Sequence, residues 1–180
     1  MLKELFSEIP YLENEYIILK SLTDADSQSL EKLRKNKSVY RYLPTFLFEQ
    51  QIEDVHRVIN EMYESIFKNK ESLLLGIYLK KDMSFCGLAE FYGYRPEMKK
   101  ISLGYRLLEE FWGRGIATNA VSLMVDYIYG ETDIVIITAS TMVENEASAN
   151  VLRKNDFIQT VIADEDWGFA DLTTAYKWFR

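Results

Sequence analysis

Several residue types that build common functional sites are scarce in this chain. It has one cysteine, Cys86, and one histidine, His56. A single cysteine forms no internal disulfide, which fits a reducing compartment, and these two residues are too few for a His/Cys metal cluster. No apolar run approaches the roughly 20 residues that span a bilayer, and the N-terminus carries acids instead of an apolar signal core. We therefore expect a cytoplasmic protein with no metal and no membrane partner.

Tracts of basic residues are also absent, which argues against a nucleic-acid partner. The net charge is −7. An acidic surface attracts cationic substrates such as amines, but it equally serves solubility alone, and net charge does not decide between the two. The chain has 180 residues, 3 prolines and no Gly/Ser-rich tract. It is long enough for a sizeable core, and we predict a single domain over residues 1–180.

Hydrophobic periodicity predicts an alternation of strands and helices. Helical spacing marks residues 24–35, 49–68, 116–129 and 146–155, with Gly130 ending the third helix. Strand-like runs cover residues 15–22, 73–79, 85–94, 100–107, 133–139, 157–163 and 171–179. The run 133–139 is apolar almost throughout, as in a strand buried on both faces. This order predicts an α+β, or mixed α/β, fold with a largely antiparallel first half.

The most informative stretch is Phe-Trp-Gly-Arg-Gly-Ile-Ala-Thr at residues 111–118. It lies where a predicted strand turns into a predicted helix. Two glycines, Gly113 and Gly115, leave backbone N–H groups accessible there, and the positive end of the helix dipole adds to the attraction for an anion. A phosphate can approach such a backbone without meeting a Cβ. The bend is either a site for a phosphate-bearing cofactor or a simple turn, because Gly-x-Gly alone is common.

Residues 112–117, Trp-Gly-Arg-Gly-Ile-Ala, resemble the Gln/Arg-x-x-Gly-x-Gly/Ala signature of the GNAT superfamily of acetyl-CoA-dependent N-acetyltransferases. Trp112 replaces the usual Gln/Arg, and this departure is similar to the ribosomal-protein N-terminal (RimJ/RimL-like) branch. A second block, from Asn145 to Phe157, resembles that branch's Asn-x-x-Ser…Lys-x-Gly-Phe pattern, with Asp156 where the family usually has Gly. The resemblance covers roughly residues 15 to 178.

The resemblance implies a GNAT fold, with a mostly antiparallel sheet of about six or seven strands, about four flanking helices, and a splay between the fourth and fifth strands. It also implies acetyl-CoA as cosubstrate. The pyrophosphate would bind the N–H groups at residues 113–118, and the pantetheine arm would pair with the end of strand 100–107. The implied cofactor residues are Tyr105, Leu107, Gly113, Arg114, Gly115, Ile116, Ala117, Thr118 and Asn145. Asn145 is equally suited to cap the helix after it, and Arg114 to lie in solvent.

In the implied reaction, a neutral amine attacks the acetyl thioester directly. Where many family members have a glutamate base or a tyrosine acid, this chain has Ser102, Ser140 and Leu152. We expect Glu90 to accept the amine proton, directly or through water, because a carboxylate on a mostly apolar strand face needs a reason. A purely structural carboxylate is the alternative. Resemblance to the ribosomal branch indicates Ser148 as the group that protonates the leaving thiolate.

The expected acceptor is a primary amine, on a protein N-terminus or on a small molecule. Its pocket is expected between the first two helices, Tyr92 and the connection at 164–171, where Trp167 and Phe169 either line the pocket or pack. A non-catalytic acyl-CoA-binding sensor is the alternative function, because the usual acid and base are missing. A dinucleotide-binding oxidoreductase is disfavoured, because Thr118 stands where that fingerprint needs a third small residue. Monomer and homodimer both stay open.

Overall fold

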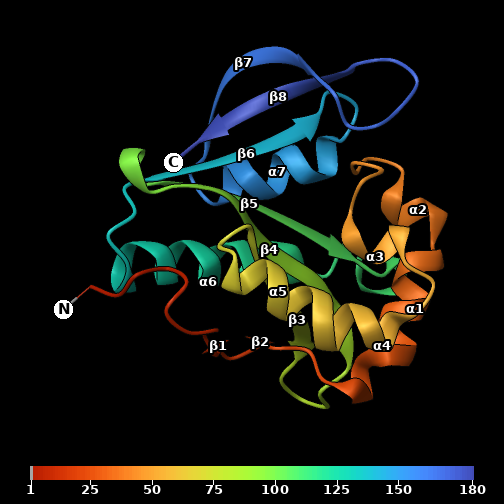
Figure 1. Cartoon of the computed structure of the whole chain (residues 1–180). Helices are drawn as coiled ribbons and strands as arrows, with labels where there is room; N and C mark the ends of the chain where they lie inside the picture. The colour runs from red at the N-terminus through yellow and green to blue at the C-terminus, as the bar shows by residue number, and fades with distance from the viewer. Residues whose placement is uncertain (1) are drawn as a thin grey trace.

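The computed structural model describes residues 2–180, and their strands form one eight-stranded sheet (Figure 1). The order across the sheet is β1-β2-β3-β4-β5-β6-β8-β7. The strands are β1 (Leu12–Glu13), β2 (Ile17–Lys20), β3 (Ser72–Leu79), β4 (Phe85–Arg95), β5 (Lys100–Leu107), β6 (Ile136–Met142), β7 (Ile158–Glu165) and β8 (Thr173–Phe179). Every neighbouring pair is antiparallel except β5 and β6. The mixed α/β class predicted from the sequence is confirmed, and the short β1 adds an eighth strand.

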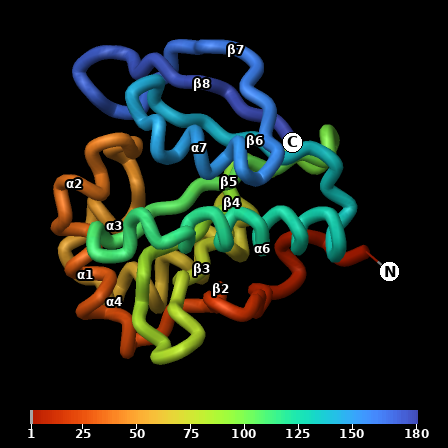
Figure 2. The backbone as a smooth tube through the Cα atoms, turned by 180° about the vertical axis from the view of Figure 1, so that it is seen from behind, coloured from red at the N-terminus to blue at the C-terminus, as the bar shows by residue number. Residues whose placement is uncertain are grey.

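Helices cover both faces of this sheet. The helical segments are η1 (Asp24–Asp26), α1 (Ser27–Lys35), α2 (Lys37–Tyr40), α3 (Phe48–Gln51), α4 (Val55–Arg57), the π-helical η2 (Val58–Met62), α5 (Tyr63–Lys68), η3 (Pro96–Met98), η4 (Glu109–Phe111), α6 (Ile116–Glu131) and α7 (Glu146–Lys154). Seen from behind, α6 and α7 lie in front of the sheet (Figure 2). Alternation along β4 sends Ala89 and Phe91 into the core under α6, and Leu88 into a second core with α1, α4 and α5. The sheet therefore separates two apolar cores.

The connection from β5 through α6 to β6 creates the one parallel pair among the described strands. Parallel neighbours need such a crossover, and α6 packs on the sheet through a buried stripe that includes Val121, Met124 and Ile128. The last register pair between β5 and β6 is Ser102 with Thr138. Beyond it, β5 remains paired with β4, and β6 pairs with β8. The sheet therefore opens between β5 and β6, on the side where β5 ends and α6 begins.

The continuous helix predicted over residues 49–68 is wrong. The chain leaves the helical conformation at Ile52, whose φ is −121° and ψ is 136°. Asp54 then restarts it, because its carboxylate accepts hydrogen bonds from the backbone N–H groups of His56, at 3.0 Å, and Arg57. The apolar spacing persists through the break, so periodicity alone does not reveal it.

Two predicted boundaries also move. Gly130 lies inside α6 and does not end it; the hydroxyl and the N–H of Thr132 donate to the Ile128 carbonyl, at 2.7 and 3.2 Å, and the helix ends there. The strand predicted at 133–139 begins only at Ile136. The residue before it, Val135, and Ile136 itself donate their N–H groups to the Lys99 carbonyl, so the chain first turns into its parallel alignment with β5. Within residues 2–180, no helix is both long and apolar enough for a membrane crossing.

Candidate active site

The separation of β5 and β6 opens a cleft of about 1210 Å³. Its walls are the two diverging strands, the first turns of α6 and α7, the chain from α2 to α3, and the β7–β8 hairpin. The aromatic side chains that line it include Tyr42, Phe48, Tyr92 and Trp167. A cleft of this size holds a ligand with a long arm together with a second, smaller ligand.

The bend before α6 presents bare backbone to this cleft. Gly113 and Gly115 have φ values of +69° and +75°, in the left-handed region that favours glycine. A Cβ on Gly113 would meet nothing within 4 Å, and one on Gly115 would meet only Asn119 Nδ2, at 3.9 Å. No side chain caps α6, and the N–H groups of a first helical turn, here residues 116–118, have no partner within their helix. The bend is therefore open to an anion.

Three side chains shape this bend from outside. The indole of Trp112 donates to the Leu107 carbonyl at 2.8 Å and folds the bend back onto the end of β5. Leu107 is one of the residues that the resemblance implies for the cofactor, and its carbonyl accepts this bond within the protein. The Arg114 guanidinium lies over the Phe111 ring, at 5.6 Å from its centroid, and Arg114 is not among the residues that line the cleft.

The start of α7 also lines the cleft. Asn145 Oδ1 accepts from the Ser148 N–H at 3.1 Å and caps the helix. The Tyr105 hydroxyl, from β5, donates to Ser148 Oγ at 3.1 Å. Burial raises the pKa of Tyr105 to about 12, so this phenol stays protonated at neutral pH. Because Ser148 Oγ accepts that bond, the hydrogen of Ser148 remains available to another acceptor in the cleft.

Glu90 lies on the cleft wall within a buried cluster of charges. Its Oε1 accepts from the Ser72 hydroxyl at 2.8 Å, and its Oε2 accepts from Arg106 Nη1 at 3.0 Å. Arg106 Nε also pairs with Glu49 Oε1, and the Tyr40 hydroxyl donates to that same oxygen at 2.9 Å. Burial lowers the pKa of Arg106, but the negative charges of Glu49 and Glu90 raise it by more, so that pKa lies well above the usual value. The guanidinium is therefore permanently charged.

The register partner of Glu90 on β5 is Gly104, which places no side chain against it from that strand. The Tyr92 ring lies beside Gly104, within 3.5 Å of where a Cβ would be. Glu49 and Arg106 were not predicted from the sequence. Arg106 shares a strand face with Gly104, which was a usable signal, whereas Glu49 lies in a predicted amphipathic helix and gave none.

At the positions where many family members have their catalytic acid or base, this chain has Ser102, Ser140 and Leu152, and each has other partners in the structure. The Ser102 and Thr138 hydroxyls are 2.8 Å apart. Ser140 Oγ accepts from Lys177 Nζ at 2.9 Å, and Lys177 also pairs with Glu165. Leu152 is buried in the core. Lys177 and Glu165 line the cleft, and neither was predicted from the sequence.

The expected acceptor pocket is partly corrected. Neither of the two helices expected to form it, at 24–35 and 49–68, contributes a residue to the cleft. The segment after α2 does so instead, through Tyr42, Leu43, Pro44, Phe46, Leu47 and Phe48. Trp167 lines it but Phe169 does not. The Thr45 N–H donates to the Trp167 carbonyl at 2.8 Å. Gly168 follows with φ +82°, where a Cβ would fall 2.0 Å from Thr45 Oγ1, so glycine is required for this contact between two loops.

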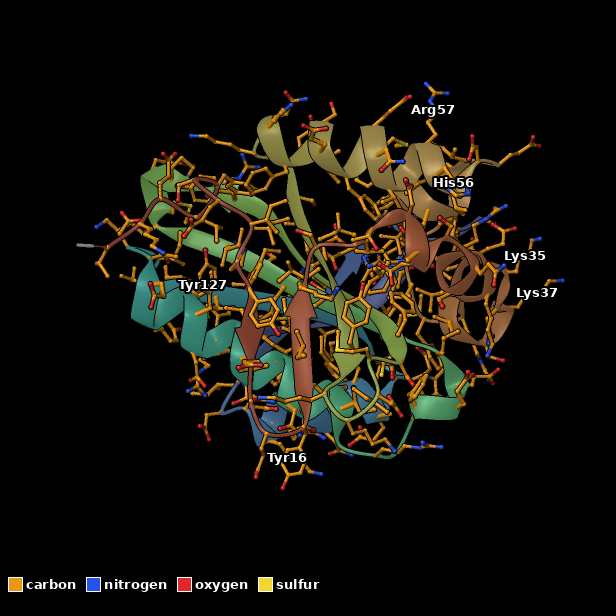
Figure 3. The ribbon with its side chains drawn as sticks, turned by 90° about the horizontal axis from the view of Figure 1, so that it is seen from below. Tyr16, Lys35, Lys37, His56, Arg57 and Tyr127 are labelled. Atoms are coloured by element: carbon orange, nitrogen blue, oxygen red, sulfur yellow. The ribbon has the colours of Figure 1, made fainter. Side chains whose placement is uncertain are left out.

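The single cysteine and the single histidine lie away from this chemistry. Cys86 is buried, and burial raises the pKa of its thiol to about 12, so it is a core residue. His56 lies at the edge of the molecule beside Arg57 (Figure 3). Its Nδ1 lies 3.1 Å from Ser27 Oγ and 3.5 Å from Asp24 Oδ1. Within residues 2–180, no group of three or more His, Cys, Asp or Glu side chains is arranged to hold a metal ion.

Comparisons with known proteins agree with this geometry. A family model described as "Acetyltransferase (GNAT) domain" matches residues 17–158. The uncharacterized N-acetyltransferase YoaA of Bacillus subtilis is 25% identical over 150 residues, which are 82% of each chain. RimL, a ribosomal α-N-protein acetyltransferase solved with coenzyme A, superposes with a TM-score of 0.80 at 17% identity, over 95% of this chain and 97% of its own. A spermidine N-acetyltransferase of Vibrio cholerae, solved with CoA and spermine, gives a TM-score of 0.76 at 15% identity, over 93% and 96%. At these identities the structural matches establish the fold.

Proposed function

The chain belongs to the GNAT acetyltransferase family, and we propose that it moves the acetyl group of acetyl-CoA to a primary amine, on a protein N-terminus or on a small molecule. Acetyl-CoA is the cosubstrate of this family. The family and fold expected from residues 112–117 and 145–157 are confirmed. The observation that carries the proposal is the open cleft between β5 and β6, which ends at the unblocked backbone of the bend before α6.

The cofactor would lie along this cleft. We propose that its pyrophosphate binds the N–H groups of residues 113–118 and that its pantetheine arm follows the unpaired edge of β5 past Tyr105 towards Asn145. The absence of register pairs between β5 and β6 beyond Ser102 supports this route, because an extended arm can take the place of a strand there. The Arg114 side chain does not line the cleft. We propose that it attracts the cofactor phosphates only through its positive charge.

The amine would then attack the thioester carbon directly. The new C–N bond forms as the C–S bond breaks. One amine proton goes to Glu90, directly or through water, and from there to solvent. The thiolate takes a hydrogen from Ser148, which regains one from solvent. The hydrogen bond from Tyr105 supports this role of Ser148, because it leaves the serine hydrogen free to donate. Each Glu90 oxygen accepts one hydrogen bond and retains a second lone pair for the amine or a water.

Two considerations bear on the acceptor: the free energy of deprotonating the amine, and the acceptors named for proteins that share this fold. At pH 7, removing a proton from an α-amine with a pKa near 8 costs about 1 kcal/mol, whereas a lysine-type amine with a pKa of about 10.4 costs about 4–5 kcal/mol. An α-amine therefore needs a weaker base. One fold neighbour is named for a ribosomal α-N-protein reaction and the other for spermidine, so both amine classes belong in the test. The cytoplasmic location, the single domain and the choice between monomer and homodimer stay predictions.

Thiol release from acetyl-CoA tests the proposal. Purified protein is mixed with acetyl-CoA and a panel of N-terminal peptides, polyamines, aminoglycosides and amino acids. We expect release with at least one member, and loss of release when the amine of a peptide acceptor is blocked. Binding of coenzyme A without turnover across the panel would contradict catalysis and favour an acyl-CoA sensor.

A further inference from the structure

The cleft wall beside Glu90 contains two charged side chains that the proposed reaction does not use. Glu49, Arg106 and Glu90 are 0%, 4% and 7% exposed. Arg106 pairs with both carboxylates, and within residues 2–180 no other cationic side chain pairs with either of them. The cluster therefore carries one more negative charge than positive charge.

Neutral groups complete the rest of the cluster. The hydroxyls of Tyr40 and Ser72 donate to Glu49 and Glu90, and Glu49 Oε2 is buried with no partner among the described residues. An unbalanced charge in such a place is costly. Either a proton on one carboxyl balances it, or a cation arrives from outside. Glu90 lines the cleft and Glu49 does not, so an arriving cation meets Glu90.

We propose that Glu49 and Arg106 are positioning residues, which make the cleft select an acceptor that arrives as a protonated amine. This inference rests on the proposed function. Arg106 holds the Glu90 carboxylate in place through Nη1. Glu49 cancels the charge of Arg106, which would otherwise repel an ammonium at Glu90. The excess negative charge of the cluster is thereby presented at Glu90 alone.

The cleft that Glu90 lines also contains aromatic rings, which suit an ammonium attached to an apolar group. Tyr92 and Trp167 line the same cleft, and aromatic faces attract cations and pack against hydrocarbon. The docked ammonium passes one proton to Glu90, and the neutral amine then attacks the thioester carbon. When the C–S bond breaks, the thiolate takes the hydrogen of Ser148 and the second amine proton replaces it on Ser148. Glu90 returns the first proton to solvent. The substrate class is therefore a basic primary amine with an apolar neighbour.

Binding of two matched probes tests the charge of the cluster without any need for turnover. Benzylamine is an ammonium at neutral pH, and benzyl alcohol has nearly the same shape without the charge. Each is titrated by calorimetry into protein saturated with coenzyme A. Glu49→Gln keeps the size of the side chain and the oxygen that accepts from Tyr40. It removes one negative charge from a residue that does not line the cleft.

We expect wild type to bind benzylamine at least tenfold more tightly than benzyl alcohol. Glu49→Gln should raise the Kd of benzylamine about tenfold and leave that of benzyl alcohol within twofold, since only the ammonium senses a charge. The matched control is Glu64→Gln, because Glu64 is exposed and pairs with Lys68 on α5; both Kd values should stay at the wild-type level.

Three outcomes overturn the proposal. In the first, wild type binds the two probes equally, a result that needs no variant to fold. In the second, Glu49→Gln weakens both probes alike, which indicates a purely structural role. In the third, it changes neither, which indicates that a proton already balances the cluster. Failure of the proposed function is a separate result: no amine releases thiol from acetyl-CoA, although the benzylamine preference and its loss in Glu49→Gln persist.

Discussion

Replacing Gly115 with alanine separates the role of the bend in folding from its role in binding coenzyme A. Gly115 has φ +75°, where a side chain costs about 1–2 kcal/mol. A Cβ would meet only Asn119 Nδ2, at 3.9 Å, an ordinary contact that adds no packing penalty. The free energy of unfolding should therefore fall by about 1–2 kcal/mol. For a chain of this size, that lowers the melting temperature by about 2–8 °C.

The effect on coenzyme A should be separate from this loss of stability. The new methyl group would stand on the surface that the pyrophosphate approaches, so we expect the Kd of coenzyme A to rise at least tenfold, or about 1.4 kcal/mol. Gly130→Ala is the matched control in the same helix. A Cβ there meets nothing within 4 Å and the backbone is helical, so this change should stabilise the protein by up to about 1 kcal/mol and leave the Kd unchanged.

Thermal unfolding and calorimetry, run on wild type and both variants, decide between these roles. A Gly115→Ala protein that melts lower as expected but binds coenzyme A within twofold of wild type would refute the reasoning. The bend would then be a structural turn, and the pyrophosphate would need another site.

Three further predictions concern proton transfer and stability. Glu90→Gln should lower kcat by about 10²–10⁴-fold and alter the pH–rate profile; an unchanged profile removes Glu90 from the mechanism. Ser148→Ala should lower kcat by less than about tenfold in single turnovers, since a thiolate whose thiol has a pKa near 8.5 leaves readily, and weaker coenzyme A binding with unchanged chemistry would make it a binding residue. Hydrogen bonds and charge from Arg34 and Lys35 lower the pKa of Glu31 to about 2. The lowered pKa stabilises the fold above the unfolded pKa of ~4.3, and that stabilisation is lost as pH falls towards 2. In urea unfolding, Glu31→Gln should therefore be less stable than wild type at pH 7, with a much smaller difference at pH 2. An equal difference at both pH values would contradict this prediction.

The parts of the site that the sequence predicted are local in the chain. The glycines at 113 and 115 and the cap at Asn145 depend on backbone conformation within a few residues, and both glycines adopt positive φ while Asn145 caps α7. The splay between β5 and β6 followed from the family resemblance. The alternation along β4 also indicated that Glu90 shares a face with Leu88.

The parts that the sequence could not predict depend on contacts between distant segments. Glu49 is buried because α3 meets Arg106 on β5, and nothing near Glu49 in the chain indicates that partner. The break after α3 follows from the Asp54 cap, which competes locally with an uninterrupted apolar spacing. Loop closure at Gly168 needs Thr45, more than a hundred residues earlier. Local pattern gives the elements, and these long-range contacts shape the acceptor side of the cleft.

A crystal structure of the coenzyme A complex tests the central claim most directly. We predict pyrophosphate oxygens within hydrogen-bonding distance of the backbone N–H groups at residues 113–118, and the thiol in the gap between β5 and β6, near Ser148. Coenzyme A bound at any other surface, or a bend that closes over its own N–H groups in the complex, would contradict the account.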